Sequence, residues 1–110
     1  DYSLNIALAY GGREELIHAI QKIAKDVKKD KLKIKDIKEE VVSKYLYTEG
    51  IPDPDIILRT SGEERISNFL LWQLAYSELY FSDVYWPAFS KRDFLKAIYT
   101  CQQRKRRFGK

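Results

Sequence analysis

Residues 53–67 read DPDIILRTSGEERIS, and this stretch decides the fold. The Asp-Pro pair at its start breaks the preceding element, and the apolar run from Asp55 to Thr60 is typical of a short buried strand. Ser61–Arg65 then forms the loop that leaves the carboxyl end of that strand. Because strands that are apolar on both faces occur mainly in parallel sheets covered by helices, the stretch predicts an α/β fold.

A helix is predicted after the loop, from Phe69 to about Tyr76, with Ser67 or Asn68 as its cap. Its residues are apolar nearly all round, and a helix without a polar face has to be covered on more than one side. We therefore expect it to be buried, either in the fold or in a subunit interface. Leu79–Phe81 is typical of a second strand.

Upstream of the deciding stretch, the sequence predicts one more strand and two more helices. Leu4 to Ala9 is a mostly apolar run ended by Gly11-Gly12, which favours a buried parallel strand and a tight turn. Apolar residues recur at helical spacing from Glu14 to about Lys29 and again from about Ile34 to Tyr47. The order of elements indicates a mainly parallel sheet flanked by helices.

A last helix is predicted from Lys91 to about Arg106, with Ser90 as its cap. The chain carries a net charge of +4, and residues 101–110 hold five basic residues and no acidic one. Such a tail can attract nucleic acid, anionic lipid or a diphosphate, and charge alone does not choose among them. A solvated helix end is the simplest alternative.

The composition is that of one globular domain, with 110 residues of which 45% are hydrophobic and 33% charged. No apolar run approaches the roughly 20 residues that cross a bilayer. The single cysteine, Cys101, cannot form an internal disulfide, and one distant histidine, His18, offers it no metal site. We expect a soluble protein in a reducing, cytoplasmic setting, with His18 in a structural role. Because the sequence contains no Met, we also expect it to be a fragment of a longer chain.

Two arginines and a serine follow the strand at 55–60. In open α/β sheets, ligands bind at the carboxyl ends of the strands, beside the N-termini of the next helices. Arg59 ends the strand, Arg65 lies in the loop and Ser67 stands at the predicted helix start, a set that suits a diphosphate. The alternative is that both arginines pair with nearby carboxylates, those of Asp55, Glu63 or Glu64. Spacing alone leaves the two interpretations even.

Glu78 follows the apolar helix predicted at 69–76, where a carboxylate is costly unless it has a partner. It could bind Mg²⁺, which is commonly held by one or two carboxylates together with substrate phosphate oxygens. On its position alone, a surface or ion-pair role for Glu78 is favoured over a metal role.

The longest recognisable motifs lie on either side of residue 64. They read ILRTSGE at 57–63, RISNFLLWQ at 65–73, AY at 75–76 and ELYF at 78–81, and together they resemble the signature region of the cis-prenyltransferases, the undecaprenyl and dehydrodolichyl diphosphate synthase family. Shorter blocks are similar to the family at Asn5–Ala7 with Tyr10–Arg13, at Trp86-Pro87 and at Arg107–Gly109. Only the stretch from about Lys22 to Gly50 lacks a recognisable motif.

The resemblance implies a role for each candidate residue. Arg59, Arg65 and Ser67 would bind the diphosphate of isopentenyl diphosphate, and Glu78 would help to hold Mg²⁺. The resemblance further implies a homodimer in which two tail residues, Arg107 and Gly109, reach into the neighbouring subunit's site.

The same resemblance implies a transferase that condenses isopentenyl diphosphate onto an allylic prenyl diphosphate with cis stereochemistry. We expect residues 1–110 to be the C-terminal part of a single domain. The family's N-terminal half, with the loop that supplies the catalytic Asp, is absent from this sequence, so the chain alone should be inactive. Ala88 stands where many relatives have Asp, which puts any role of that acid in doubt.

Two other functions compete with an enzyme. A non-catalytic partner subunit of the same fold would tend to lose the Arg-Thr-Ser-Gly-Glu segment, which is present here at 59–63. A module for nucleic acid or anionic lipid would rest on the basic tail alone, without a second basic stripe or an aromatic platform. We therefore expect no nucleic-acid partner, a dimer surface that includes residues 69–76 and the following strand, and contact with a membrane surface only for product release.

Overall fold

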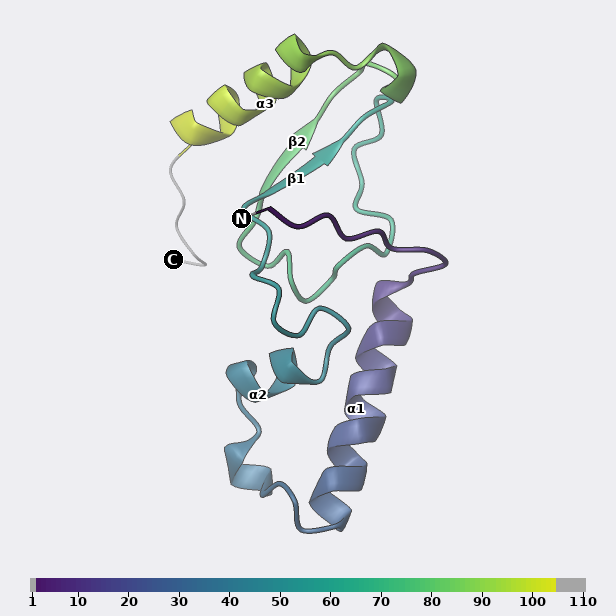
Figure 1. Ribbon diagram of the computed structural model, residues 1–110, viewed down its shortest axis with the longest axis vertical. Helices are drawn as coiled ribbons and strands as arrows, with labels where there is room; N and C mark the ends of the chain where they lie inside the picture. Colours follow the sequence, from purple (N-terminus) through teal and green to yellow (C-terminus); the bar gives the residue numbers. More distant parts are fainter. Residues whose placement is uncertain (1, 105–110) are drawn as a thin grey trace. The chain divides into compact units, whose positions relative to one another are not determined.

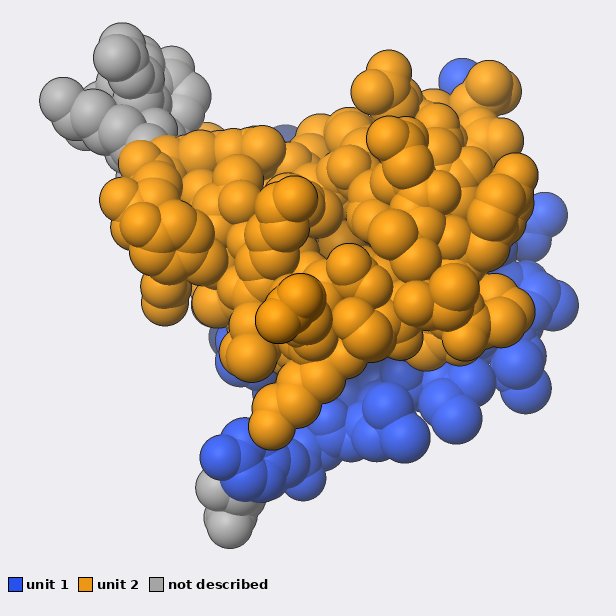
Figure 2. All heavy atoms as spheres, turned by 90° about the horizontal axis from the view of Figure 1, so that it is seen from above, with its two compact units in different colours: residues 1–52, 68–70 blue, residues 53–67, 71–110 orange. Residues whose placement is uncertain are grey.

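The computed structural model describes residues 2–104, which fall into two compact units coloured separately in Figure 2. Unit 1 comprises residues 1–52 and 68–70, and unit 2 comprises residues 53–67 and 71–110. Within residues 2–104, no helix has both the length and the apolarity that a bilayer crossing would need.

Unit 2 is built on a two-stranded parallel sheet. Strand β1 (Ile56–Arg59) pairs with β2 (Glu78–Phe81), so that Arg59 lies opposite Phe81 at the carboxyl end of both strands. Figure 1 shows the strands side by side with helix α3 (Lys91–Gln103) next to them, and α3 contacts both. A parallel sheet with helices confirms the predicted fold class.

Helix α3 begins where the sequence places its cap. The Ser90 hydroxyl accepts a hydrogen bond from the Asp93 backbone N–H at 3.2 Å, and the Ser90 N–H donates to the Asp93 carboxylate at 2.9 Å. This capping box satisfies two backbone donors at the helix start. Ala97 and Cys101 are buried, whereas Tyr99 is exposed. The helix ends at Gln103, before the predicted Arg106.

The main element of unit 1 is helix α1 (Gly12–Lys28), which confirms the prediction from Glu14 to about Lys29. Acidic residues lie in its first turn and basic residues in its last, in agreement with the helix dipole. Ala19 and Glu15 are buried.

The second helix predicted for unit 1 is broken into two short pieces. A 3₁₀ turn covers Ile34–Asp36 and helix α2 covers Glu39–Lys44, with extended backbone at Ile37 and Lys38 between them (Figure 1). Two physical reasons apply. The stretch is rich in β-branched residues, which lose side-chain freedom in a helix, and the acidic pair at 39–40 favours a new helix N-terminus there.

The strand predicted from Leu4 to Ala9 is wrong for the described chain. Residues 2–10 form no strand, and Leu4, Ile6 and Leu8 are exposed to 86%, 74% and 84%. A parallel strand is held by hydrogen bonds to its neighbours, and the sheet of the described residues pairs only β1 with β2. The segment has the composition of a buried strand, but it pairs with no strand among residues 2–104.

The helix predicted from Phe69 to Tyr76 is also wrong, because the segment folds into turns. Ser67, Asn68 and Leu70 have φ angles of 48°, 63° and 45°, in the left-handed region that a right-handed helix cannot use. The segment is also less buried than predicted, because its two end residues, Phe69 and Tyr76, are 39% and 49% exposed.

Candidate functional site

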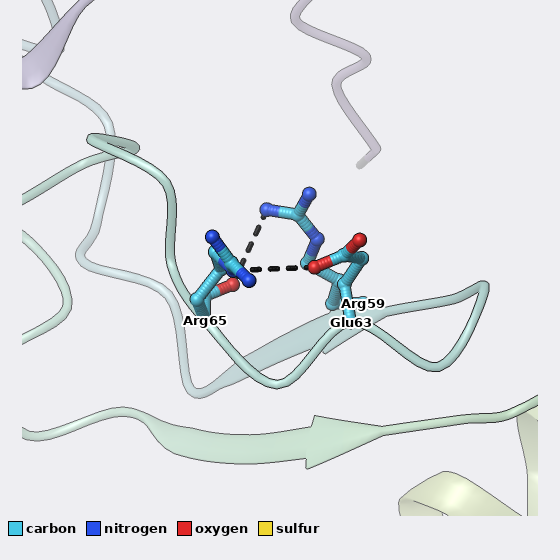
Figure 3. Close-up of polar contacts among 3 residues, drawn as sticks. All are labelled: Arg59, Glu63 and Arg65. Atoms are coloured by element: carbon cyan, nitrogen blue, oxygen red, sulfur yellow. Dashed lines mark hydrogen bonds and ion pairs between the residues drawn. The ribbon is translucent and has the colours of Figure 1, made fainter.

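Arg59 lies where the sequence places it, at the carboxyl end of β1. Its backbone carbonyl accepts a hydrogen bond from the Ser82 N–H at 2.8 Å, which fixes the strand end. Its guanidinium donates through Nη1 to the carbonyl oxygen of Arg65 at 3.2 Å. Figure 3 shows this side chain reaching back over the loop toward Arg65.

The loop after β1 is held at its start by the segment that follows β2. The Ser61 N–H donates to the Val84 carbonyl at 3.0 Å, and the Gly62 N–H donates to the Ser82 carbonyl at 2.9 Å. Gly62 has a φ of 71°, a conformation that costs glycine little and other residues more. These contacts set the direction in which the chain leaves the strand.

Arg65 forms an ion pair within the same loop. Its Nε lies 3.2 Å from Oε2 of Glu63, and the two side chains are 74% and 47% exposed (Figure 3). The alternative that the sequence left open, pairing with a nearby carboxylate, is thus present in the structure. An exposed pair of this kind contributes about 0–1 kcal/mol, so exchange of Glu63 for another anion costs little.

Ser67 is exposed, and its backbone is left-handed. Because residues 69–76 form turns, Ser67 does not stand at a helix N-terminus, and the predicted contribution of a helix dipole to the site is wrong. What the structure brings together is Arg59, at the end of β1, and the backbone of Arg65 in the loop after it, with Ser67 two residues further along the chain.

Asn68 has a role that the sequence analysis missed. It groups with unit 1, where its backbone carbonyl accepts from the Gly12 N–H at 2.7 Å and its side-chain Oδ1 accepts from the Arg13 N–H at 3.0 Å. It therefore caps α1 rather than a helix of its own. Asparagine's preference for left-handed and helix-capping positions was a usable signal, but the sequence does not show which helix is capped.

Glu78 opens β2 and does not follow a helix, which corrects the predicted context. Its side chain is 17% exposed, and Oε2 lies 3.7 Å from Nη1 of Arg104. The same nitrogen donates to the Leu79 carbonyl at 2.5 Å. The ion-pair alternative is therefore realised for this residue too.

The described residues do not form a metal site by themselves. Across residues 2–104, no three His, Cys, Asp or Glu side chains gather closely enough to hold an ion. Glu78 supplies one half-buried carboxylate, a hard oxygen donor of the kind that Mg²⁺ prefers, and its partner Arg104 is itself partly exposed. The arrangement fits a single protein ligand in a site completed by other groups.

A buried carboxylate lies in unit 1. Glu15 is 1% exposed, and it accepts hydrogen bonds from the Tyr10 hydroxyl and from the Tyr47 N–H, the latter at 2.8 Å. Burial and the neighbouring Glu15 carboxylate both raise the pKa of Tyr10 well above its usual range. The His18 ring lies against Tyr47, with ring centroids 5.1 Å apart. Motifs and apolar spacing do not reveal this cluster, because Tyr47 lies 32 residues from Glu15 along the chain and meets it only in the fold.

Two predicted site residues, Arg107 and Gly109, lie outside the described residues.

Comparison with known proteins identifies the family. The sequence model described as "Putative undecaprenyl diphosphate synthase" matches residues 1–109. The chain is 66% identical over its whole length to the tritrans,polycis-undecaprenyl-diphosphate synthase (geranylgeranyl-diphosphate specific) of Thermoplasma acidophilum, and 61% identical to the protein of the same name from Pyrococcus furiosus. It spans 43% and 42% of the length of these two relatives.

Solved structures agree with the sequence comparison. The lavandulyl diphosphate synthase of Lavandula x intermedia, crystallised with dimethylallyl diphosphate, superimposes with a TM-score of 0.88 at 42% identity. That match covers 94% of this chain and 45% of the lavender protein. The chain belongs to the undecaprenyl diphosphate synthase family, the cis-prenyltransferases.

Proposed function

We propose that this chain is part of an enzyme that condenses isopentenyl diphosphate onto an allylic prenyl diphosphate to make a polyprenyl diphosphate with cis double bonds. The observation that carries the proposal is the 66% identity, over the entire chain, to a relative named for this type of synthesis. That name specifies geranylgeranyl diphosphate, and we propose it as the allylic substrate here. Residues 1–110 would form the C-terminal part of one domain, and the remainder of the protein would supply the catalytic Asp.

The substrate proposed for the loop after β1 is the diphosphate of isopentenyl diphosphate. Arg59 and Arg65 offer planar donor groups that match phosphate oxygens, and Ser67, two residues beyond Arg65, adds a hydroxyl donor. Without substrate, the Glu63 carboxylate forms an ion pair with the Arg65 guanidinium at 3.2 Å. The incoming diphosphate would replace Glu63 as the partner of Arg65. A substrate with several negative charges gains more from the two arginines than one exposed carboxylate does.

Catalysis by these residues would be electrostatic and positional. The new carbon–carbon bond forms between the double bond of isopentenyl diphosphate and the allylic carbon that loses its diphosphate, and a proton then leaves to give the cis alkene. Arg59, Arg65 and Ser67 would hold the attacking molecule by its diphosphate, so that its double bond faces the allylic carbon. None of these side chains needs to form a covalent bond to the substrate.

Magnesium is proposed as the cofactor, with Glu78 as one ligand. When bound, the ion would neutralise diphosphate charge and assist departure of the leaving group. Glu78 would first have to exchange part of its interaction with Arg104, which at 3.7 Å is a loose pair.

The proposed assembly is a homodimer located in the cytoplasm, with contact at a membrane surface for release of the long product. Arg107 and Gly109 would reach into the neighbouring site. Mixing chains inactivated by Arg107→Ala with chains inactivated by Arg65→Ala tests the crossing. One site of each mixed dimer then carries both changes and the other neither, so part of the activity should return. No recovery after proven subunit exchange would mean that the tail serves its own subunit.

The activity itself is tested with the full-length protein, labelled isopentenyl diphosphate, geranylgeranyl diphosphate and Mg²⁺. We expect chain elongation, and NMR of the product should show that the added units carry cis double bonds. Folded protein that elongates no allylic diphosphate on its own would contradict the proposal and favour a non-catalytic partner subunit.

A further inference from the structure

The end of the loop that carries Arg65 and Ser67 is fastened by the next residue, Asn68. Both oxygens of Asn68 are used, since its carbonyl accepts from Gly12 at 2.7 Å and its side chain accepts from Arg13 at 3.0 Å. Gly12 and Arg13 are the first two residues of α1, whose N–H groups have no partners within the helix. The chain directly after Ser67 is therefore fixed through two hydrogen bonds.

The backbone around Asn68 is held in an uncommon conformation. Ser67, Asn68 and Leu70 all have positive φ angles, of 48°, 63° and 45°. Such conformations cost free energy for residues other than glycine, and they persist only where the surroundings impose them. Asparagine tolerates the left-handed region better than most residues, so it combines this backbone shape with a side-chain acceptor.

Gly11 leaves room for the Asn68 amide. A Cβ built on Gly11 would lie 3.1 Å from Nδ2 of Asn68, which is too close without a shift of that amide. Gly11 itself has extended backbone with a φ of −138°, so its need for glycine comes from this approach and not from its own backbone. Gly11 and Asn68 thus form a matched pair.

We propose that Asn68 is a positioning residue for the isopentenyl diphosphate site. By fixing the peptide after Ser67, it would hold the loop that bears Arg65 and Ser67 in the conformation that receives the diphosphate, without touching the substrate itself. The inference rests on the proposed function of that loop. Gly11 supports this role because it has no side chain that would displace the Asn68 amide.

Two substitutions separate the side-chain acceptor from the backbone shape. Asn68→Gly keeps the left-handed conformation accessible and removes Oδ1, whereas Asn68→Asp keeps an acceptor for the Arg13 N–H. Isothermal titration of the full-length protein with isopentenyl diphosphate alone measures binding without turnover. We expect Asn68→Gly to weaken binding about 2- to 10-fold, as for one lost hydrogen bond, and Asn68→Asp to bind like the wild type when both are measured in high salt, which screens the charge of the new carboxylate. Thermal melting of each variant reports its stability separately.

A merely structural role would give a different pattern. If Asn68→Gly lowers the melting temperature but binds isopentenyl diphosphate as the wild type does, the proposal is overturned. Equal weakening by Asn68→Gly and Asn68→Asp in high salt, where repulsion between the new carboxylate and the diphosphate is screened, would also overturn it, because the acceptor would then be irrelevant.

Gly11→Ala gives a second test that does not change Asn68. We expect Gly11→Ala alone to weaken isopentenyl diphosphate binding. Combined with Asn68→Gly, it should cause no further loss, because the amide that the new methyl group meets is then absent. Additive effects would contradict the pairing. Arg65→Ala serves as the reference: if it leaves binding unchanged, the proposed function of the loop fails, whereas if it weakens binding and Asn68→Gly does not, only the positioning role fails.

Discussion

At the scale of single residues, the candidate site is defined by what its charged groups do before any substrate arrives. Arg65 is paired with Glu63 and Arg59 is bonded to a backbone carbonyl, so neither guanidinium is committed to a strong buried partner. Exposed pairs of this strength exchange readily for a better anion. Exchange of these contacts for the diphosphate that we propose as ligand would therefore cost little.

Arg65→Ala in the full-length enzyme should weaken isopentenyl diphosphate binding by about 1.5 to 3 kcal/mol, or roughly 10- to 150-fold, as for a lost charged hydrogen-bonding partner. Binding of the allylic substrate should change far less. Titration calorimetry with each substrate separately measures both effects. Glu63→Gln is the matched control, because it removes the competing carboxylate and should leave isopentenyl diphosphate binding equal or tighter. Equal losses for both substrates would contradict the assignment.

Glu78→Gln should shift the dependence of activity on Mg²⁺ to higher concentrations, since an amide is a weaker ligand than a carboxylate for this ion. The magnesium titration has to be made with both substrates present, because one carboxylate does not hold the ion without phosphate oxygens. Arg104→Gln is the control for the lost ion pair with Glu78. If the two variants respond identically, the ion pair and not the metal accounts for the effect.

At the scale of elements, α3 depends on a local signal that can be tested by itself. Ser90→Ala should lower the free energy of unfolding by about 1 kcal/mol, because the cap hydrogen bond to the Asp93 N–H is lost. Urea denaturation of the full-length protein measures this, and Ser90→Thr, which keeps a hydroxyl, should behave nearly as the wild type. A loss as large for Thr as for Ala would mean that the cap is not the cause.

The same cap carries a pH dependence. Hydrogen bonds from the Ser90 N–H and hydroxyl lower the pKa of Asp93 below its ordinary value of 3.8. A carboxyl group whose pKa is lower in the folded state stabilises the fold above its ordinary pKa, and that contribution disappears as the pH falls through the folded value. The free energy of unfolding should therefore differ most between wild type and Ser90→Ala near neutral pH, and this difference should become smaller below about pH 4. A difference that is constant down to pH 2 would contradict this.

Elements with local signals were predictable from the sequence. The apolar run before Arg59 gives β1, the spacing of apolar residues gives α1, and Ser90 with Asp93 gives the start of α3. The strand predicted at 4–9 failed because pairing decides a strand and the described residues provide no partner. The helix predicted at 69–76 failed because contacts of Asn68 with α1 favour a left-handed backbone at its start, and no periodicity reveals such contacts.

The positions of the candidate residues along the chain were predictable from the sequence, but the groups that they contact were not. Arg59 ends β1 and Arg65 lies in the loop after it, as expected, since strand ends and loops follow from chain order alone. The partners of Arg65 and Glu78 were open in the sequence because several opposite charges lie within reach of each. The hydrogen bond between Asn68 and the start of α1 could not be predicted, because it joins residues 55 apart in the chain.

At the scale of the whole molecule, the chain exposes apolar surface on several elements. Phe94, Leu95 and Tyr99 of α3 are 49%, 52% and 64% exposed, in addition to the apolar side chains at 2–8. Covering large apolar side chains with another polypeptide removes them from water, which is favourable. The remaining length of the protein and a second subunit are the two sources of cover that the proposed function implies.

The full-length protein should be a dimer at micromolar concentration, which light scattering with size-exclusion chromatography measures as molar mass. The reason is that a shared surface would cover apolar residues that one small domain leaves exposed. Dilution through the nanomolar range gives the dissociation constant. A monomer at micromolar concentration would contradict the proposed assembly, although the assignment of Arg59 and Arg65 would stand.

The central claim is that the loop after β1 binds the diphosphate of isopentenyl diphosphate. The most direct measurement is a crystal structure of the full-length protein with isopentenyl diphosphate alone, which cannot condense without an allylic partner. We expect diphosphate oxygens within hydrogen-bonding distance of Arg59, Arg65 and Ser67, with the Arg65 guanidinium turned away from Glu63. Isopentenyl diphosphate bound elsewhere, with the Arg65–Glu63 pair intact, would contradict the claim.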